Sequence, residues 1–262
     1  MPRIARGLID GGIYHVLNRG NGKRDIFHKT KDFAAFHNLI CETKKRYKIS
    51  ILAYCLMPNH FHLVLRPMRG NDLSRSMQWL MTTHVRRYHR YYNSTGHVWQ
   101  GRYKSFIIQQ DAHLLTVLRY VERNPVRGDL VLSAKDWEWS SHRERIGQSS
   151  NPLLSRLPIS LPPDWECYVD RPLTDVEIEG LRHSVKRQSP YGEPEWQLKV
   201  GKQLGLESTL RSLGRPRSPA KRGQATFTKR DTHLFLSSSS KSSQPSEQPG
   251  RKKGTGYFLS QE

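Results

Sequence analysis

The run Pro58-Asn59-His60-Phe61-His62-Leu63-Val64-Leu65 places two histidines two positions apart in an apolar stretch that is rich in strand-forming residues. Successive side chains of a β-strand point to opposite faces, so His60 and His62 are predicted to share one face while Phe61 and the leucines face a core. Neutral imidazole is the commonest metal ligand in proteins, and the pair therefore fits a divalent-metal site. Two polar residues on a solvated strand face explain the pair equally well, and the choice needs evidence from elsewhere in the chain.

That evidence comes from a predicted helix between Ala112 and Asn124, which ends because Pro125 disfavours helical geometry in the residue before it. Tyr120 and Asn124 are four positions apart and share one helix face. Two imidazoles and a carboxamide oxygen would hold a divalent cation with open positions, one of which a phosphodiester oxygen could take. A tyrosine hydroxyl nearby could then attack phosphorus and form a phosphotyrosine. The base that removes its proton is not identified by the sequence.

The composition favours a polyanionic partner. The 262 residues include 43 Lys and Arg against 23 Asp and Glu, which gives a formal net charge of +20. Such a charge favours nucleic acid before membrane, and no apolar run approaches the length that spans a bilayer. Three widely spaced cysteines form no disulfide framework or metal-ligand pattern and fit a reducing cytoplasm.

Hydrophobic periodicity predicts an α+β domain. His15 faces the same way as Ile13 and Leu17 and is predicted to be a partly buried strand histidine. A helix from about residue 72 is expected to take Asn71 or Asp72 as its cap. The predicted strands are 13–18, 49–56, 60–66 and 106–108, and the predicted helices are 31–47, 72–92 and 112–124, the last capped by Asp111.

The chain changes character after this region. We divide it into a main domain at 1–148, a linker with a helical extension at 149–213, and a basic, serine-rich tail at 214–262 that is expected to be disordered. Thr174 opens a capping box for a helix to about Arg187, and another helix is predicted from Pro194 to Leu204. These two helices are either a small DNA-reading module or a pair packed on the main domain. Gly214–Arg217 resembles the core of an AT-hook.

Several basic and aromatic residues are candidates for DNA contact. They lie in a glycine-rich loop, on the 72–92 helix beside tyrosines, in the segment before the last strand and in the tail, where cations and rings together suit nucleic-acid binding. Solvated loops and helix faces explain many of them as well. The candidates are Arg19, Arg24, Arg86, Arg90, Trp99, Arg102, Lys104, Arg127, Arg215 and Arg217.

Four segments in order resemble the single-tyrosine HUH-type transposases, and more closely the REP-associated tyrosine transposases of the IS200-like family. Over residues 13 to about 145 these motifs are specific. They are Tyr14-His15-Val16-Leu17-Asn18-Arg19-Gly20, Tyr54-Cys55-Leu56-Met57-Pro58-Asn59-His60-Phe61-His62, Trp99-Gln100-Gly101-Arg102-Tyr103 and Tyr120-Val121-Glu122-Arg123-Asn124-Pro125-Val126-Arg127.

The resemblance implies a fold and a mechanism. The fold would be a ferredoxin-like HUH endonuclease, with a central antiparallel sheet flanked by helices. His60, His62 and Asn124 would hold Mg²⁺ or Mn²⁺. Tyr120 would take the 5′ phosphate of cleaved single-stranded DNA, next to palindromic repeats that fold into hairpins. The resemblance also implies a monomer or homodimer in the cytoplasm, associated with the nucleoid.

Three other functions stay open. The first is a non-catalytic DNA-binding or regulatory protein of the same fold. The second is a hydrolytic metallonuclease that uses water and does not need Tyr120. The third is a rolling-circle replication initiator or relaxase, which the short chain and the absence of a helicase region disfavour.

Overall fold

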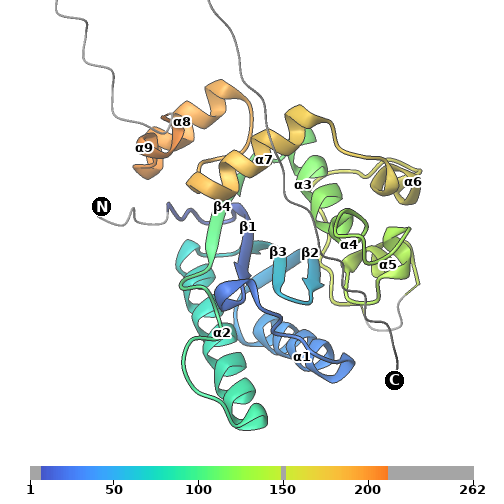
Figure 1. Ribbon diagram of the computed structural model, residues 1–262. Coiled ribbons are helices and arrows are strands. Elements are labelled where there is room, and N and C mark those ends of the chain that lie inside the picture. The colour runs from blue at the N-terminus through green and yellow to red at the C-terminus, as the bar shows by residue number, and fades with distance from the viewer. Residues whose placement is uncertain (1–6, 149–151, 212–262) are drawn as a thin grey trace, which may run out of the picture. The chain divides into compact units, whose positions relative to one another are not determined.

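A four-stranded antiparallel sheet lies at the centre of the computed structural model, which describes residues 7–148 and 152–211 (Figure 1). The strand order is β2-β3-β1-β4, so β3 and β1 are the inner strands. A two-residue turn at Pro58 and Asn59 joins β2 to β3 and makes the predicted hairpin. The strands are β1 (Ile13–Arg19), β2 (Ile49–Met57), β3 (His60–Pro67) and β4 (Lys104–Ile108).

Two helices, α1 (Thr30–Arg46) and α2 (Gly70–Tyr92), cover one face of the sheet. With the strands they follow the chain order β1-α1-β2-β3-α2-β4, which is the ferredoxin-like topology. Phe36 of α1 and Leu73 of α2 pack with Phe61 of β3 in a buried cluster. The α+β class with a central antiparallel sheet is therefore confirmed, and Phe61 faces the core as its position in the strand predicts.

The other face of the sheet is covered by helices that follow β4 in the chain. Leu118 of α3 packs against the sheet in a second buried cluster together with Val64 of β3, and Trp165 and Leu181 close this cluster from further along the chain. The helices on this side are α3 (Ala112–Glu122), α4 (Asn124–Arg127), α5 (Ser141–Arg145), α6 (Trp165–Asp170) and α7 (Asp175–Arg187). The sheet is thus sandwiched between two helical layers (Figure 1).

The predicted helical extension packs on the sheet. Tyr191 donates its backbone N–H to Ile107 and accepts one from Gln109, which adds a short parallel bridge at the free edge of β4. Leu181 of α7 has no exposed surface. Of the two alternatives left open by the sequence, the structure therefore shows a pair packed on the main domain. The remaining elements are α8 (Pro194–Leu204), α9 (Glu207–Leu210) and the 3₁₀ turns η1 (Asn21–Lys23) and η2 (Ala134–Asp136).

Local signals placed several helix ends correctly. Asp111 caps α3 by accepting the backbone N–H of His113 at 2.8 Å. Thr174 and Glu177 form the predicted capping box of α7. Helix α8 has the predicted bounds. Short-range side-chain to backbone bonds explain these successes, because all their partners lie within three residues.

Two helix ends differ from the prediction by two residues. Helix α2 begins at Gly70 rather than after Asn71 or Asp72, and the Gly70 N–H donates to the Asp10 carboxylate, 2.7 Å away and sixty positions upstream. A cap so distant in sequence leaves no local signal. Helix α3 ends at Glu122, two residues early, and the short helix α4 starts at Asn124.

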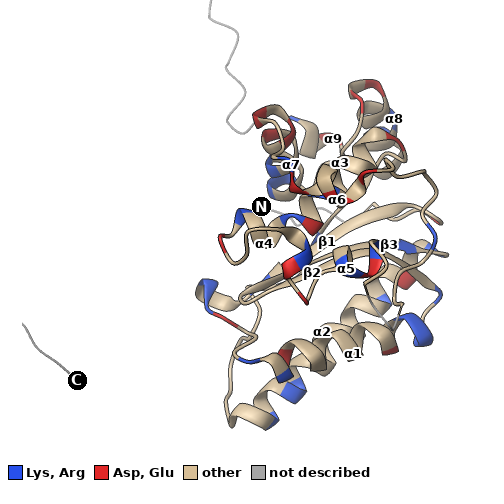
Figure 2. Cartoon of the chain, turned by 90° about the vertical axis from the view of Figure 1, so that its right-hand side faces the viewer, with Lys and Arg blue, Asp and Glu red and all other residues tan. Residues whose placement is uncertain are grey.

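Charge is unevenly distributed over the described elements. Basic residues are spread over α1 and α2, whereas several acidic residues lie on α6 and α7 (Figure 2). Within residues 7–148 and 152–211, no helix is long and apolar enough to cross a membrane. The predicted tail at 214–262, with its AT-hook resemblance, lies outside the described residues.

Candidate active site

His60 and His62 lie at the start of β3 and point to the face that α3 covers. The register of β1 with β3 places Arg19 opposite His60 and Leu17 opposite His62. His62 is buried, at 2% exposure, whereas His60 is half-buried. The side-chain oxygen of Asn59 lies 2.6 Å from Nδ1 of His60. Because an amide oxygen only accepts, Nδ1 is the donor and Nε2 of His60 keeps its lone pair.

A third histidine belongs to this group. His15 of β1 is fully buried, and its Nε2 lies 2.9 Å from Nδ1 of His62. The two rings are nearly parallel, with centroids 5.0 Å apart. The sequence placed His15 correctly inside a strand but gave it no part in the site. Strand alternation could not reveal the contact between His15 and His62, because this contact depends on how β1 pairs with β3.

The three imidazoles are neutral near pH 7. Burial lowers the pKa of His15 to about 3. Burial, followed by the nearby Arg19, lowers the pKa of His60 to about 4. Burial, and then the neighbouring histidines, holds the pKa of His62 well below its usual range. Neutral imidazole is the form that binds metals.

Tyr120 and Asn124 meet the histidines from the helical side. The Tyr120 ring packs edge-on against His62, with centroids 5.7 Å apart. Asn124 is buried and lies one turn beyond Tyr120, where its side chain forms a hydrogen bond with His60 that raises the pKa of this histidine against the larger effect of burial. The tertiary fold therefore brings together all four residues that the sequence singled out.

Arg127 of α4 joins this group. Its Nη2 donates to the Tyr120 hydroxyl at 3.2 Å and lies 3.4 Å from the Asn124 side-chain oxygen. The guanidinium also lies 4.9 Å from the centroid of the Tyr120 ring. The sequence assigned Arg127 to DNA contact, and the structure places it against the candidate nucleophile itself.

The donor set fits a divalent cation. Nε2 of His62 is buried without a hydrogen-bond partner, which is costly for a polar atom unless it has another ligand. In the tautomer in which His62 Nδ1–H donates to His15, Nε2 of His62 offers its lone pair to a metal, and hydrogen bonds of this kind orient metal-binding histidines in other proteins. Asn124 adds a carboxamide oxygen. No cluster of three or more His, Cys, Asp or Glu with metal-binding geometry occurs among the described residues, so any cation here would need this mixed set.

A buried carboxylate anchors the helix that carries Tyr120. Glu122 has no exposed surface and accepts hydrogen bonds from Ser141, His142 and Arg145 of α5 and from Trp165 of α6. Burial alone would raise its pKa, but Arg145 and then His142 outweigh burial and lower the pKa to about 2. Glu122 therefore holds α3 in place at a position two residues after Tyr120, the candidate nucleophile.

The predicted DNA contacts fall into three groups. Arg19, Lys104 and Arg127 lie close to the site, since Arg19 is opposite His60 and Lys104 pairs with Leu17 on the same face. Others lie on exposed positions. These are Arg24, which donates to the His97 carbonyl, Arg86 and Arg90 on α2, and Arg102, while Arg215 and Arg217 lie outside the described residues.

Trp99 corrects one of these predictions. Its side chain is only 5% exposed and packs against Phe36, Phe61 and His84 in the core. A base cannot stack on a ring that is covered in this way, so Trp99 is a core residue in this structure. The neighbouring basic residues made the segment resemble a stacking surface, but the sequence did not show that its ring turns inward.

The comparison with protein families matches the part of the chain that carries the site. Residues 9–124 match the model of the family described as Transposase IS200 like. That span contains the sheet, both histidines of β3, Tyr120 and Asn124. Residues 9–124 of this chain are therefore similar to an IS200-like transposase domain.

The chain is also similar to REP-associated tyrosine transposases. It is 26% identical over 158 residues to a Haemophilus influenzae protein described as such, with 55% of this chain and 88% of the relative covered. It is 21% identical over 154 residues to the REP-associated tyrosine transposase of Escherichia coli, with 58% and 90% covered. A solved REP-associated tyrosine transposase bound to a REP hairpin aligns with a TM-score of 0.49 at 18% identity, over 66% of this chain and 100% of that one.

Proposed function

We propose that this protein is a transposase that cleaves and rejoins single-stranded DNA through a covalent bond to Tyr120. The observation that carries the proposal is the convergence of His60 and His62, from β3, with Tyr120 and Asn124, from the α3–α4 junction. These elements are far apart in sequence and are brought together by the packing of α3 on the sheet. A neutral histidine pair beside a tyrosine hydroxyl supports phosphoryl transfer better than a structural role.

His60, His62 and Asn124 are the residues that would hold Mg²⁺ or Mn²⁺. The bound cation would polarise a non-bridging oxygen of the scissile phosphate. Arg19, opposite His60 on β1, would contribute further positive charge where the phosphate lies. Both metals bind oxygen ligands well, and Mn²⁺ accepts imidazole more readily than Mg²⁺ does.

The Tyr120 oxygen would form a bond to phosphorus as the bond from phosphorus to the 3′ oxygen breaks. The phenol loses its proton and the departing oxygen gains one, which leaves a free 3′ hydroxyl and a 5′-phosphotyrosine. Because the Tyr120 hydroxyl accepts a hydrogen bond from Arg127, its own proton stays available for transfer. Attack of a 3′ hydroxyl on the phosphotyrosine reverses the step and rejoins strands, since the bond energy is retained.

The substrate we propose is single-stranded DNA beside a hairpin. The relatives' names associate them with REP elements, and one solved relative is described as bound to a REP hairpin. The formal charge of +20 suits such a partner. The protein would act as a monomer or homodimer and would be found with chromosomal DNA.

The test is formation of a covalent protein–DNA adduct in the presence of Mn²⁺. The substrate is a pool of hairpin-forming oligonucleotides with randomised flanks, labelled at the 3′ end. Wild type and Tyr91→Phe, which alters an exposed tyrosine away from the site, should both yield a labelled band that survives denaturation. Tyr120→Phe should yield none. Cleavage that persists in Tyr120→Phe would indicate a hydrolytic nuclease, and binding without cleavage by wild type would indicate a DNA-binding protein.

A further inference from the structure

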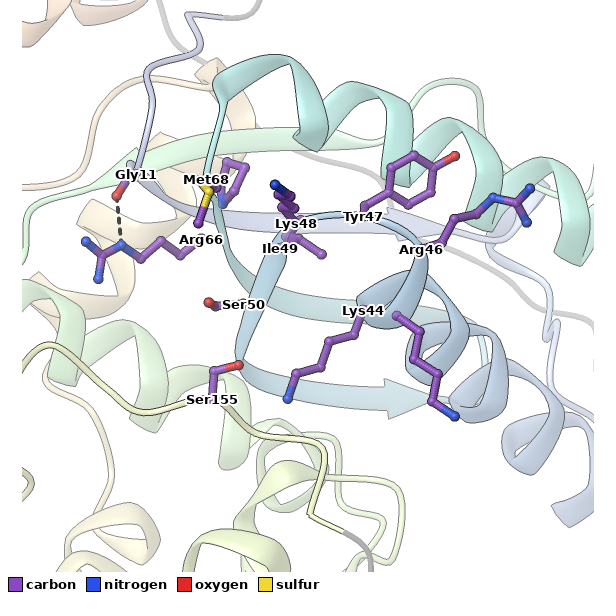
Figure 3. Close-up of a pocket in the computed structure, with 12 residues that line it drawn as sticks. Gly11, Lys44, Arg46, Tyr47, Lys48, Ile49, Ser50, Arg66, Met68 and Ser155 are labelled. Atoms are coloured by element: carbon purple, nitrogen blue, oxygen red, sulfur yellow. Dashed lines mark hydrogen bonds between the residues drawn. The ribbon is translucent and has the colours of Figure 1, made fainter.

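A basic pocket lies at the opposite end of β3 from the histidine pair (Figure 3). It has a volume of about 810 Å³ and is formed by the last turn of α1, the start of β2 and the end of β3. No Asp or Glu is among the described residues that line it. Its five cationic side chains are Lys44, Lys45, Arg46, Lys48 and Arg66.

Three of these cations are held in place by the fold. Lys44 donates to the Leu153 carbonyl at 2.6 Å. Arg66 donates through Nε to the Gly11 carbonyl at 3.1 Å, and Figure 3 draws this bond. The Arg46 guanidinium lies 5.2 Å from the centroid of the Trp79 ring. These contacts engage neutral partners, so they orient the cations without neutralising their charge.

The other two cations are free. Lys45 and Lys48 are exposed, and the ammonium group of neither forms a hydrogen bond or an ion pair with any residue in the described part of the chain. The hydroxyl groups of Ser50 and Ser155 also line the pocket and offer neutral donors. The pocket therefore presents hydrogen-bond donors and positive charge, and no carboxylate is among the described residues that line it.

The helix dipole accounts for only part of this arrangement. It favours cations in the last turn of α1, which covers Lys44, Lys45 and Arg46. It does not explain Lys48, which follows the end of α1, or Arg66, which lies on β3. Like charges gathered from separate elements repel one another, and a bound polyanion would relieve that repulsion.

The position of the pocket sets the kind of anion. Arg66 lies six residues along β3 from His60, which corresponds to about 20 Å along the strand. Phe61 to Leu65, between the two places, are buried, so DNA must pass outside the sheet. At about 3.4 Å per base pair, at least about six base pairs are needed to cover the separation. One DNA molecule with a stem of that length or more can reach both places, whereas an isolated phosphate or a nucleotide cannot.

We propose that this pocket binds the phosphodiester backbone of duplex DNA, in the stem of the same molecule whose single-stranded part enters the active site. This inference rests on the proposed function, because it takes the DNA to be held at His60 and His62 as well. Lys45 and Lys48 make the new phosphate contacts, and Lys44 and Arg66 form the fixed floor of the pocket. The length of the stem therefore controls the affinity of the protein for hairpin DNA, whereas the chemistry of cleavage does not depend on it.

The test compares Lys45→Glu/Lys48→Glu with wild type on two hairpins that share one single-stranded segment. Their stems have about four and about twelve base pairs, on either side of the length that spans the two sites. Wild type should bind the long stem more tightly. The variant should lose about tenfold or more of this affinity, and its salt slope on the long stem should fall by about two. Its affinity and adduct yield on the short stem should not change.

The matched control is Lys199→Glu/Lys202→Glu, which makes the same charge change on exposed residues of α8. It should retain the wild-type dependence on stem length. An equal loss on both stems, or no loss on either, would overturn the inference while leaving adduct formation as independent support for the proposed function. If no adduct forms, the proposed function fails, and a lost preference for long stems would still identify the pocket as a duplex site.

Discussion

The Nε2 atom of His15 on β1 lies 2.9 Å from the Nδ1 atom of His62 on β3, inside the sheet face that α3 covers. This contact joins the first and third strands of the fold at the candidate metal site. It also governs which nitrogen of His62 is free, because a proton on Nδ1 leaves the lone pair on Nε2. We therefore infer that His15 is a positioning residue, which would act on the proposed metal through His62.

Replacing His15 tests that role. His15→Ala removes the partner of His62 Nδ1 and should weaken Mn²⁺ binding by about 10- to 100-fold. His15→Gln retains a polar atom near the place of Nε2 and should restore part of the affinity. Mn²⁺ affinity can be measured directly by calorimetry or by the electron paramagnetic resonance signal of free Mn²⁺. Equal affinity in His15→Ala and wild type would exclude a positioning role.

Arg127 offers a second test, because it contacts both the candidate nucleophile and Asn124. Removal of one donor to a developing charge costs about 10²- to 10³-fold in rate in other enzymes. Arg127→Ala should therefore slow adduct formation on this scale in single-turnover assays, with a much smaller effect on DNA affinity. Arg127→Lys should recover part of the rate. A loss confined to DNA affinity would make Arg127 a DNA contact only, as the sequence first indicated.

Glu122 should be important for stability. Glu122→Gln replaces a carboxylate oxygen with an amide that faces existing donors, and it leaves Arg145 without its ion-pair partner. Breaking a buried pair in this way costs about 3 to 5 kcal/mol. Urea denaturation of the variant should show that loss, whereas Glu138→Gln, at an exposed position, should leave the free energy of unfolding unchanged.

The same carboxylate predicts an acid limit. Its pKa is lowered from an ordinary 4.5 to about 2 in the folded protein, so folding favours the charged form. The resulting stability, about 3 kcal/mol, is present above pH 4.5 and is lost as the pH falls toward 2. Wild type should lose stability across this window in urea titrations at stepped pH, and Glu122→Gln should show a flatter profile. Parallel profiles for the two proteins would contradict this account.

Salt should weaken DNA binding steeply. Neutralising phosphates with Lys and Arg releases counterions, and six to ten such contacts cost about 10³- to 10⁵-fold in affinity between 50 and 200 mM salt. The net charge of +20 and the exposed cations beside the site predict a slope of this size. A nearly flat dependence of affinity on salt concentration would mean that base contacts, rather than phosphates, dominate binding.

Local pattern predicted much of the fold. The alternation in β3 placed His60 and His62 on one face and Phe61 in the core, and capping residues located the start of α3 and of α7. All of these features depend on neighbours within a few residues. Where a cap came from a distant part of the chain, as with Asp10 at the start of α2, the prediction failed.

The sequence by itself determined the chemistry that is available, namely two imidazoles on one strand face and a tyrosine with a carboxamide one helical turn apart. Only the tertiary structure decided that these pairs meet, that His15 and Arg127 join them, and that Trp99 turns into the core. The physical reason is range. Side-chain alternation and helical spacing are set by the backbone of one segment, whereas strand register and helix docking depend on how distant segments pack together.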